Sequence, residues 1–281
     1  MTGVQTCALP ILRSEERTVV FPLLHGPLGE DGTIQGVLEL ANIPYVGTGV
    51  LGSAVSMDKG VAKQVLAANG IQQPEFRTLR DSQVTDAALR AIADDLGFPI
   101  FVKPANMGSS VGITKAKNAE ELRRAVDTAL TYDEWVVFEE SVRGREIEVA
   151  VLGNLTAKPS VPGEIVPSRE FYDYEDKYIG DGAQLIVPAR LSPEETTAVQ
   201  QLAIVIFHTL RAEGMARVDF FYEEGGRGFL CNEINTIPGF TPISMYPKLW
   251  QASGLTYSRL LDELIELALE RHARRRRNTA R

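Results

Sequence analysis

The sequence predicts a mixed α/β fold of the α+β kind, in which two α+β units follow a partial parallel-sheet segment. Three observations predict it. Short apolar runs of strand length alternate with longer segments whose apolar residues recur at helical spacing. Helix-start residues and glycine stops bound those longer segments. A glycine-rich turn joins two late strands, as an antiparallel hairpin requires.

The first half of the chain predicts the N-terminal segment and the first α+β unit. Residues 18–21 and 43–46 predict strands of a parallel sheet, with a helix over residues 33–40 between them and a Gly/Ser loop after them. The elements that follow are a helix over residues 57–68 ended by Gly70, a helix over 86–96, a strand over 100–103, a helix opened by Asn118 and Glu121, and a strand over 135–139.

The second half predicts another α+β unit. It has a strand over residues 146–151, a helix from Ser192 to about residue 212, a hairpin turning at residues 223–228, and helices over 244–251 and 256–270. The expected divisions of the chain are a leader over 1–17, a partial N-terminal domain over 18–58, a central domain over 59–141, a C-terminal domain over 142–270, and a basic disordered tail over 271–281.

The composition excludes several function classes. The 281 residues are 44% hydrophobic and 23% charged, which is typical of a globular protein with more than one core. A net charge of -8 argues against nucleic acid as a partner, and no apolar run reaches the length of a membrane span. Only Cys7 and Cys231 are present, which favours a reducing cytoplasm, and Cys231 is interpreted as a packing residue.

The predicted hairpin carries a cluster of oxygen donors. Residues two apart on a strand share a face, so Glu233 and Asn235 point the same way, as do Arg217 and Asp219. Folding the hairpin brings Asp219 close to Glu233 and Asn235. Mg²⁺ prefers such oxygen ligands and completes its shell with water and phosphate. The alternative is an ordinary hairpin with an acidic edge.

A second signal follows the strand that ends at Lys103. The next residues, 104–112, are rich in Gly and Ser, and glycine lets backbone N–H groups approach a phosphate. This is not the Walker A pattern, and a flexible connector is the alternative. Glu139 and Glu140 then end a strand at a domain junction. The order of these features along the chain favours a nucleotide held between two α+β units.

Nine short runs, in order, resemble the D-alanine–D-alanine ligases of the ATP-grasp superfamily. They cover residues 25–32, 44–50, 57–59, 102–104, 108–112, 144–149, 171–178, 217–220 and 232–239. The resemblance spans about residues 18–270 and implies an ATP-grasp fold with two α+β units clasping ATP. It also implies ATP-dependent ligation of two D-alanines through an acyl phosphate, for peptidoglycan precursors, and it leaves a homodimer open.

The resemblance implies roles by position. Lys59 and Lys103 are implied to bind the ATP phosphates, and Glu139 and Glu146 the adenine and ribose. The other implied ATP-binding residues are Ser110, Glu140 and Lys177. For two Mg²⁺ ions, with Mn²⁺ as an alternative, the roles fall to Asp219, Glu233 and Asn235. For catalysis they fall to Arg217 at the oxyanion and to Ser109 and Tyr178 in the closing network, and for D-alanine to His25, Gly239 and Ser244.

The sequence departs from this family before Thr18, where the expected strand–turn–helix with its glutamate is not recognisable. An ATP-binding fragment without ligase activity therefore remains one hypothesis. A D-alanine–D-lactate ligase is another, although those enzymes carry a different loop in place of Lys177 and Tyr178. The main interpretation is the dipeptide ligase.

Overall fold

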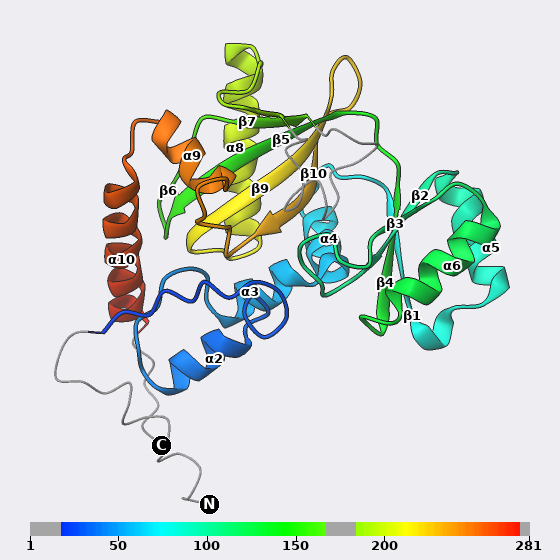
Figure 1. Cartoon of the computed structure of the whole chain (residues 1–281), viewed down its shortest axis with the longest axis horizontal. Helices are drawn as coiled ribbons and strands as arrows, with labels where there is room; N and C mark the ends of the chain where they lie inside the picture. Colours follow the sequence, from blue (N-terminus) through cyan, green and yellow to red (C-terminus); the bar gives the residue numbers. More distant parts are fainter. Residues whose placement is uncertain (1–17, 167–183, 276–281) are drawn as a thin grey trace, which may run out of the picture.

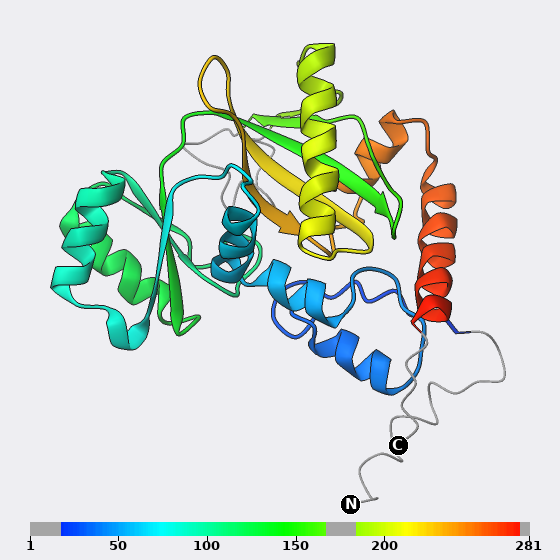
Figure 2. The same cartoon turned by 180° about the vertical axis from the view of Figure 1, so that it is seen from behind.

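The computed structural model describes residues 18–166 and 184–275. Figure 1 shows the described chain in three parts: an N-terminal segment, a central unit built on one sheet, and a C-terminal unit built on a larger sheet. The C-terminal helix stands beside the N-terminal segment, so the two ends of the described chain lie close together in both views (Figures 1 and 2). Lys177 and Tyr178 lie outside the described residues.

The N-terminal segment holds the predicted helix, α2 (Thr33–Leu40), but its predicted strands are reduced to one contact. Val20 and Tyr45 form an isolated parallel bridge, in which Val20 N donates to Pro44 O at 2.9 Å. The parallel direction was therefore predicted correctly. No further strand within the described part of the chain extends the bridge into a ladder. A small core forms behind it from Leu38, Ala41, Ile43 and Tyr45.

The prediction of a Gly/Ser loop after residue 46 is wrong, because helix α3 (Val50–Met57) occupies most of that segment. Its small residues serve close packing rather than flexibility. A Cβ at Gly52 would lie 2.5 Å from the carbonyl oxygen of Arg211, so only glycine lets this helix approach the C-terminal unit so closely. The following helix, α4 (Lys59–Ala68), starts at Asp58, whose side chain accepts from Val61 N, and Gly70 follows its end at φ +70° as predicted.

The central unit is a four-stranded antiparallel sheet in the order β1-β4-β2-β3. Its strands are β1 (Phe76–Arg80), β2 (Ile100–Pro104), β3 (Thr114–Ala116) and β4 (Trp135–Glu140). A short 3₁₀ turn (Asp81–Gln83) and the helices α5 (Asp86–Leu96) and α6 (Ala119–Ala129) complete it. The α5 and α6 helices share a core with β2 and β4, and α4 contacts β4 and β1 as well. Sequence reasoning missed β1 and β3.

The C-terminal unit is a six-stranded antiparallel sheet in the order β10-β9-β5-β7-β8, with β6 paired to β5. Its strands are β5 (Arg145–Gly153), β6 (Ala157–Pro159), β7 (Gly163–Val166), β8 (Gln184–Ile186), β9 (Gly214–Glu223) and β10 (Gly228–Asn235). Its helices are α8 (Pro193–Thr209), α9 (Met245–Ala252) and α10 (Tyr257–Arg274). The short strands β6, β7 and β8 were not predicted.

The two faces of this sheet pack against different helices. Alternate residues of β5 and β9 point to opposite faces. Val149 and Val218 join the core under α8, whereas Ala150 and Met215 join the core under α9 and α10. Helix α8 begins with the predicted capping box, because Ser192 Oγ accepts from Glu195 N at 3.1 Å and Glu195 Oε2 accepts from Ser192 N at 2.7 Å.

The prediction of a disordered tail from residue 271 is wrong for its first residues, because α10 continues to Arg274. Arg271 is only 2% exposed, its guanidinium lies 3.9 Å from the Tyr45 ring centroid, and its Nη2 donates to Tyr45 O at 3.0 Å. Arg274 pairs with Glu213, and Arg275 pairs with Glu39. Cations at a helix C-terminus also stabilise the helix, because they lie at the negative end of its dipole. The first residues of the basic run therefore end a helix and pair with acidic side chains.

Candidate active site

The β9–β10 hairpin brings the predicted oxygen cluster together. In its register Glu233 lies opposite Asp219 and Asn235 lies opposite Arg217. The strands are joined by residues 223–228, where Gly225 and Gly228 have φ values of +70° and +79°. A β-bulge between Cys231 and Glu233 turns Asn232 toward the central unit. Cys231 itself is fully buried in the apolar core, as predicted.

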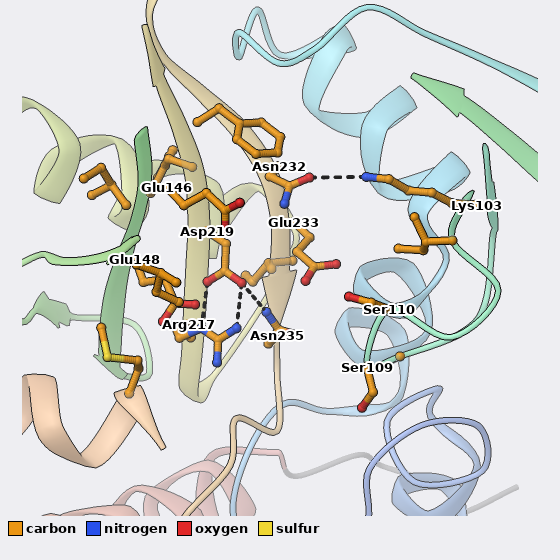
Figure 3. A pocket seen from close by; sticks show the side chains of 18 of the residues that line it. Lys103, Ser109, Ser110, Glu146, Glu148, Arg217, Asp219, Asn232, Glu233 and Asn235 are labelled. Carbon is orange, nitrogen blue, oxygen red and sulfur yellow. Dashed lines mark hydrogen bonds and ion pairs between the residues drawn. The ribbon is translucent and has the colours of Figure 1, made fainter. Parts of the chain in front are cut away.

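Arg217 is held by two carboxylates. Its Nε and Nη2 donate to the two oxygens of Asp219, each at 2.7 Å, and its Nε lies 3.1 Å from Glu148 Oε2 (Figure 3). Burial opposes the charge on the guanidinium, but Asp219 and Glu148 outweigh it, so the pKa of Arg217 lies well above its usual range. A fixed cation thus faces the cavity.

The predicted metal ligands form a compact donor set. Asn235 Nδ2 donates to Asp219 Oδ2 at 2.9 Å, and Glu233 extends beside them (Figure 3). Carboxylate and amide oxygens suit a hard divalent cation. The described residues contain no group of three or more His, Cys, Asp or Glu side chains that could hold a metal ion. Mg²⁺ needs few protein ligands, because phosphate and water commonly supply its remaining ligands.

Lys103 ends β2 on the opposite wall of the cavity. Its Nζ donates to Glu139 Oε2 at 2.7 Å and lies 3.5 Å from Asn232 Oδ1 across the gap between the two units. Glu139 is 2% exposed, and its other oxygen lies 3.3 Å from Lys63 Nζ. Burial raises the pKa of Glu139, but Lys103 and Lys63 together hold it below its usual value. Glu139 is therefore an ionised, buried partner of two lysines.

The Gly/Ser loop lies between Lys103 and the N-terminal segment. Ser109 and Ser110 adopt left-handed backbone conformations, with φ +55° and +59°, and both line the cavity opposite the hairpin (Figure 3). Lys59, at the start of α4, donates from Nζ to the Met107 carbonyl at the beginning of this loop. The loop is thus attached to one of the two predicted phosphate lysines.

The hinge between the units is a network of charges. Arg227 on the hairpin turn donates to both oxygens of Glu140, at 2.5 and 3.3 Å, and Glu140 Oε1 also accepts from Glu75 N at 2.8 Å. Arg145, at the start of β5, donates to both oxygens of Glu164 at 2.8 Å. Glu140 and Glu146 both line the cavity at this hinge.

The N-terminal segment contributes its glycine-rich loop. His25 is exposed and lines the cavity, while Glu30 is 9% exposed and its Oε2 accepts from Gly26 N at 2.6 Å. Burial raises the pKa of Glu30 to about 7; the Gly26 hydrogen bond opposes the shift, and Glu233 adds to it. Glu30 also lies next to Gly108, so it joins this loop to the Gly/Ser loop.

The segment after β10 lines one end of the cavity. Ser244 Oγ accepts from Thr241 N at 3.0 Å. A Cβ at Gly239 would lie 2.6 Å from Ser244 Oγ, so a larger residue there would displace this hydroxyl from Thr241. Ser244 precedes α9 without capping it through its side chain, so its hydroxyl faces the loop.

One cavity of about 1500 Å³ gathers these groups. Every predicted site residue that the structure describes lines it: His25, Lys59, Lys103, Ser109, Ser110, Glu139, Glu140, Glu146, Arg217, Asp219, Glu233, Asn235, Gly239 and Ser244. The predicted roles of Lys177 and Tyr178 fall on residues outside the described ranges.

Sequence reasoning missed several residues of the site. Glu30 lies within the run of residues 25–32 that resembles the family. Glu148 shares a strand face with Glu146, so the two-residue periodicity of a strand could have indicated Glu148. Lys63 follows Lys59 by one helical turn. Asn232 and Arg227 could not be assigned, because their roles depend on the bulge and on contacts between the two units.

Comparisons with known proteins agree with this site. The sequence profile described as "D-ala D-ala ligase C-terminus" matches residues 65–266, and the profile "D-ala D-ala ligase N-terminus" matches residues 8–48. A D-alanine--D-alanine ligase of Bacillus cytotoxicus is 51% identical over 267 residues, which are 94% of this chain and 74% of that protein. One of Solibacter usitatus is 54% identical over 256 residues, 90% and 77% of the two chains.

Solved structures give the same result. The D-alanine-D-alanine ligase from Coxiella burnetii superposes with a TM-score of 0.82 at 45% identity, covering 91% of this chain and 69% of that one. The VanG D-Ala:D-Ser ligase from Enterococcus faecalis gives a TM-score of 0.82 at 41% identity, covering 89% and 72%. The expected ATP-grasp fold is confirmed, and the chain belongs to the D-alanine–D-alanine ligase family.

Proposed function

We propose that this chain is a D-alanine–D-alanine ligase, which uses ATP to join two D-alanines for peptidoglycan precursors in the cytoplasm. The observation that carries the proposal is one cavity lined by two lysines, an arginine and an oxygen-donor cluster. Family membership supports ATP and a divalent metal as participants, and we infer Mg²⁺, as two ions, from the donor set. Mn²⁺ is the alternative ion.

The proposed domains follow the three parts of the fold. Residues 18–58 would contribute to D-alanine binding, and residues 59–141 and 142–270 would hold ATP between them. The Lys59 and Lys103 ammonium groups would contact the phosphates, with Ser110 and the backbone of its loop. Glu140 and Glu146 at the hinge, with Glu139 and Lys177, would take the adenine and ribose end.

The chemistry requires the first D-alanine carboxylate to become an acyl donor. Its oxygen attacks the γ-phosphorus, and ADP leaves with the electrons of the broken P–O bond. Lys59 and Lys103 would offset negative charge on the transferring group. A divalent metal on Asp219, Glu233 and Asn235 supplies further positive charge when it is bound.

The second step forms the peptide bond. The free amine of the second D-alanine attacks the acyl carbon and forms the C–N bond. The acyl C–O bond then breaks, and the proton lost by the nitrogen leaves with the departing phosphate or passes to solvent. Arg217, fixed by Asp219 and Glu148, would stabilise the oxyanion. His25, Gly239 and Ser244 would position the two D-alanines, and Ser109 and Tyr178 would close the network around them. Excluding water protects the acyl phosphate from hydrolysis.

The test is a product assay with ATP, MgCl₂ and D-alanine. We expect D-alanyl-D-alanine by chromatography, with one phosphate released per dipeptide. Parallel reactions with D-alanine plus D-lactate or D-serine distinguish the depsipeptide and D-Ala–D-Ser alternatives, the latter being the activity named for VanG. Nucleotide binding without any ligated product would refute the proposal and support the ATP-binding-fragment hypothesis. Light scattering on the same sample tests the expected homodimer.

A further inference from the structure

A buried lysine that has no role in the proposed reaction lies behind the nucleotide wall of the cavity. Lys63 is one turn after Lys59 on α4, and its side chain points to the central sheet instead of the cavity. It is 2% exposed, and its Nζ lies 3.3 Å from Glu139 Oε1 and 5.7 Å from the Phe76 ring centroid. Lysine is rarely buried unless a partner compensates its charge.

Lys63, Glu139 and Lys103 form a triad in which one carboxylate contacts two ammonium groups. Lys63 Nζ lies 3.3 Å from Glu139 Oε1, and Lys103 Nζ lies 2.7 Å from Glu139 Oε2. The two lysines and the glutamate together carry a net charge of +1. Only Lys103 and Glu139 line the cavity, so Lys63 acts from behind them. The carboxylate stays ionised because both lysines favour its charged form.

We propose that Lys63 is a positioning residue for nucleotide binding, which compensates Glu139 and so leaves the Lys103 charge available to a polyphosphate. Without Lys63, Glu139 would neutralise Lys103, and the triad would present no net charge to the nucleotide. The inference rests on the proposed function, because it concerns how that site holds ATP. It assigns Glu139 an action through Lys103 in addition to any contact with the nucleotide.

The charge argument predicts how Lys63→Met acts in two backgrounds. In the wild type the substitution takes the triad from a net charge of +1 to 0, and loss of one unit charge near the phosphates should weaken binding about tenfold in this partly solvated cavity. In the Glu139→Gln background no carboxylate remains to neutralise Lys103, so Lys63→Met should weaken binding less. Each Lys63→Met protein is compared with its own background, so any direct contact of Glu139 with the nucleotide does not enter the comparison.

The measurement is calorimetric titration with a non-hydrolysable ATP analogue and MgCl₂, with a thermal melt of each protein to show that it is folded. In steady-state assays the KM for ATP should rise in Lys63→Met while the KM for D-alanine stays unchanged. Lys63→Arg should restore binding. Lys158→Met is the matched control, because Lys158 also pairs with a glutamate, Glu263 at 2.7 Å, but lies outside the cavity.

Two results would overturn the inference. One is a folded Lys63→Met that binds the analogue as tightly as the wild type. The other is an equal loss of affinity from Lys63→Met in the wild-type and Glu139→Gln backgrounds, since a merely structural lysine would act the same whether or not Glu139 is charged. If Lys63→Met does not fold, Lys63→Gln makes the same comparison. A wild-type chain that binds no nucleotide at all would instead refute the proposed function.

Discussion

Replacing Arg217 with methionine should separate its structural role from that of a bound metal. The substitution keeps an unbranched apolar stem and removes the charge that Asp219 and Glu148 share. Glu233 lies opposite Asp219 in the hairpin, so the variant removes the Arg217 charge from beside three neighbouring carboxylates. A divalent ion bound to Asp219 and Glu233 would supply the missing positive charge.

The contacts set the size of the effect. Two ion pairs with charge centres about 4 Å apart are worth roughly 4 kcal/mol each at an effective dielectric constant of 20. Desolvation of the guanidinium opposes this by several kcal/mol, which leaves about 3–5 kcal/mol lost when one partner of a buried pair is removed. Arg259→Met is the control, because Arg259 is exposed and 3.9 Å from Asp262, and it should change stability by less than about 0.5 kcal/mol.

The assay is urea unfolding of both variants and the wild type, in EDTA and in MgCl₂. We expect Arg217→Met to lose about 3–5 kcal/mol in EDTA and to recover at least about 1 kcal/mol of that in MgCl₂, because a ligand that binds only the folded state stabilises it. Equal destabilisation with and without Mg²⁺ would refute the reasoning that the metal and Arg217 neutralise the same carboxylates. Arg217→Lys should fold normally yet lose roughly 10²–10³ in kcat, since it loses the paired donors.

Four further outcomes are expected. Glu233→Ala should abolish D-alanine-dependent phosphate release while its circular dichroism spectrum stays unchanged; near-normal turnover would contradict the metal assignment. Burial raises the pKa of Glu30 to about 7, so the folded chain keeps a proton that the unfolded chain loses above about pH 4.5. The free energy of unfolding should therefore decrease as the pH rises from about 4.5 to about 7. In metal-free urea titrations Glu30→Gln should lack this loss of unfolding free energy, which is on the order of 3 kcal/mol in the wild type. An equal loss in both proteins would show that Glu30 is not its source. Backbone amides of residues 108–112 should gain hydrogen-exchange protection with Mg-ATP plus D-alanine, and equal protection in both states would argue against a closing loop. Ser192→Ala should cost about 1 kcal/mol in urea unfolding through loss of the α8 cap, and no change would mean that Glu195 alone suffices.

Long helices and the hairpin could be predicted because their signals are local. Asn118 and Ser192 accept the capping hydrogen bonds that their positions imply, and Gly225 and Gly228 take the turn conformations expected of glycine. Short strands such as β3 and β6 could not, because three residues carry too little periodicity and become strands only by pairing with β2 and β5. Helix α3 was missed because Gly52 and its small neighbours give the same local signal as a flexible loop.

The site was predictable where chemistry and spacing coincide along the chain. Asp219, Glu233 and Asn235 lie on one hairpin, so strand periodicity places them together. The pairing of Glu139 with two lysines was not predictable, since Lys63, Lys103 and Glu139 come from three elements whose approach is set by packing. Of the two glutamates that the sequence places at the domain junction, Glu139 is a buried carboxylate and Glu140 is bound to Arg227.

The stacking of Arg271 on Tyr45 sets an order of events during synthesis. The two residues are 226 positions apart, so the N-terminal segment that holds Tyr45 leaves the ribosome long before the helix that carries Arg271. At 5–20 residues per second the delay is roughly 10–45 s. During that time the segment with α2 and α3 is without the contact that Arg271 makes to Tyr45. A nascent chain halted before residue 271 should therefore protect the central sheet from protease but leave residues 18–58 open to cleavage.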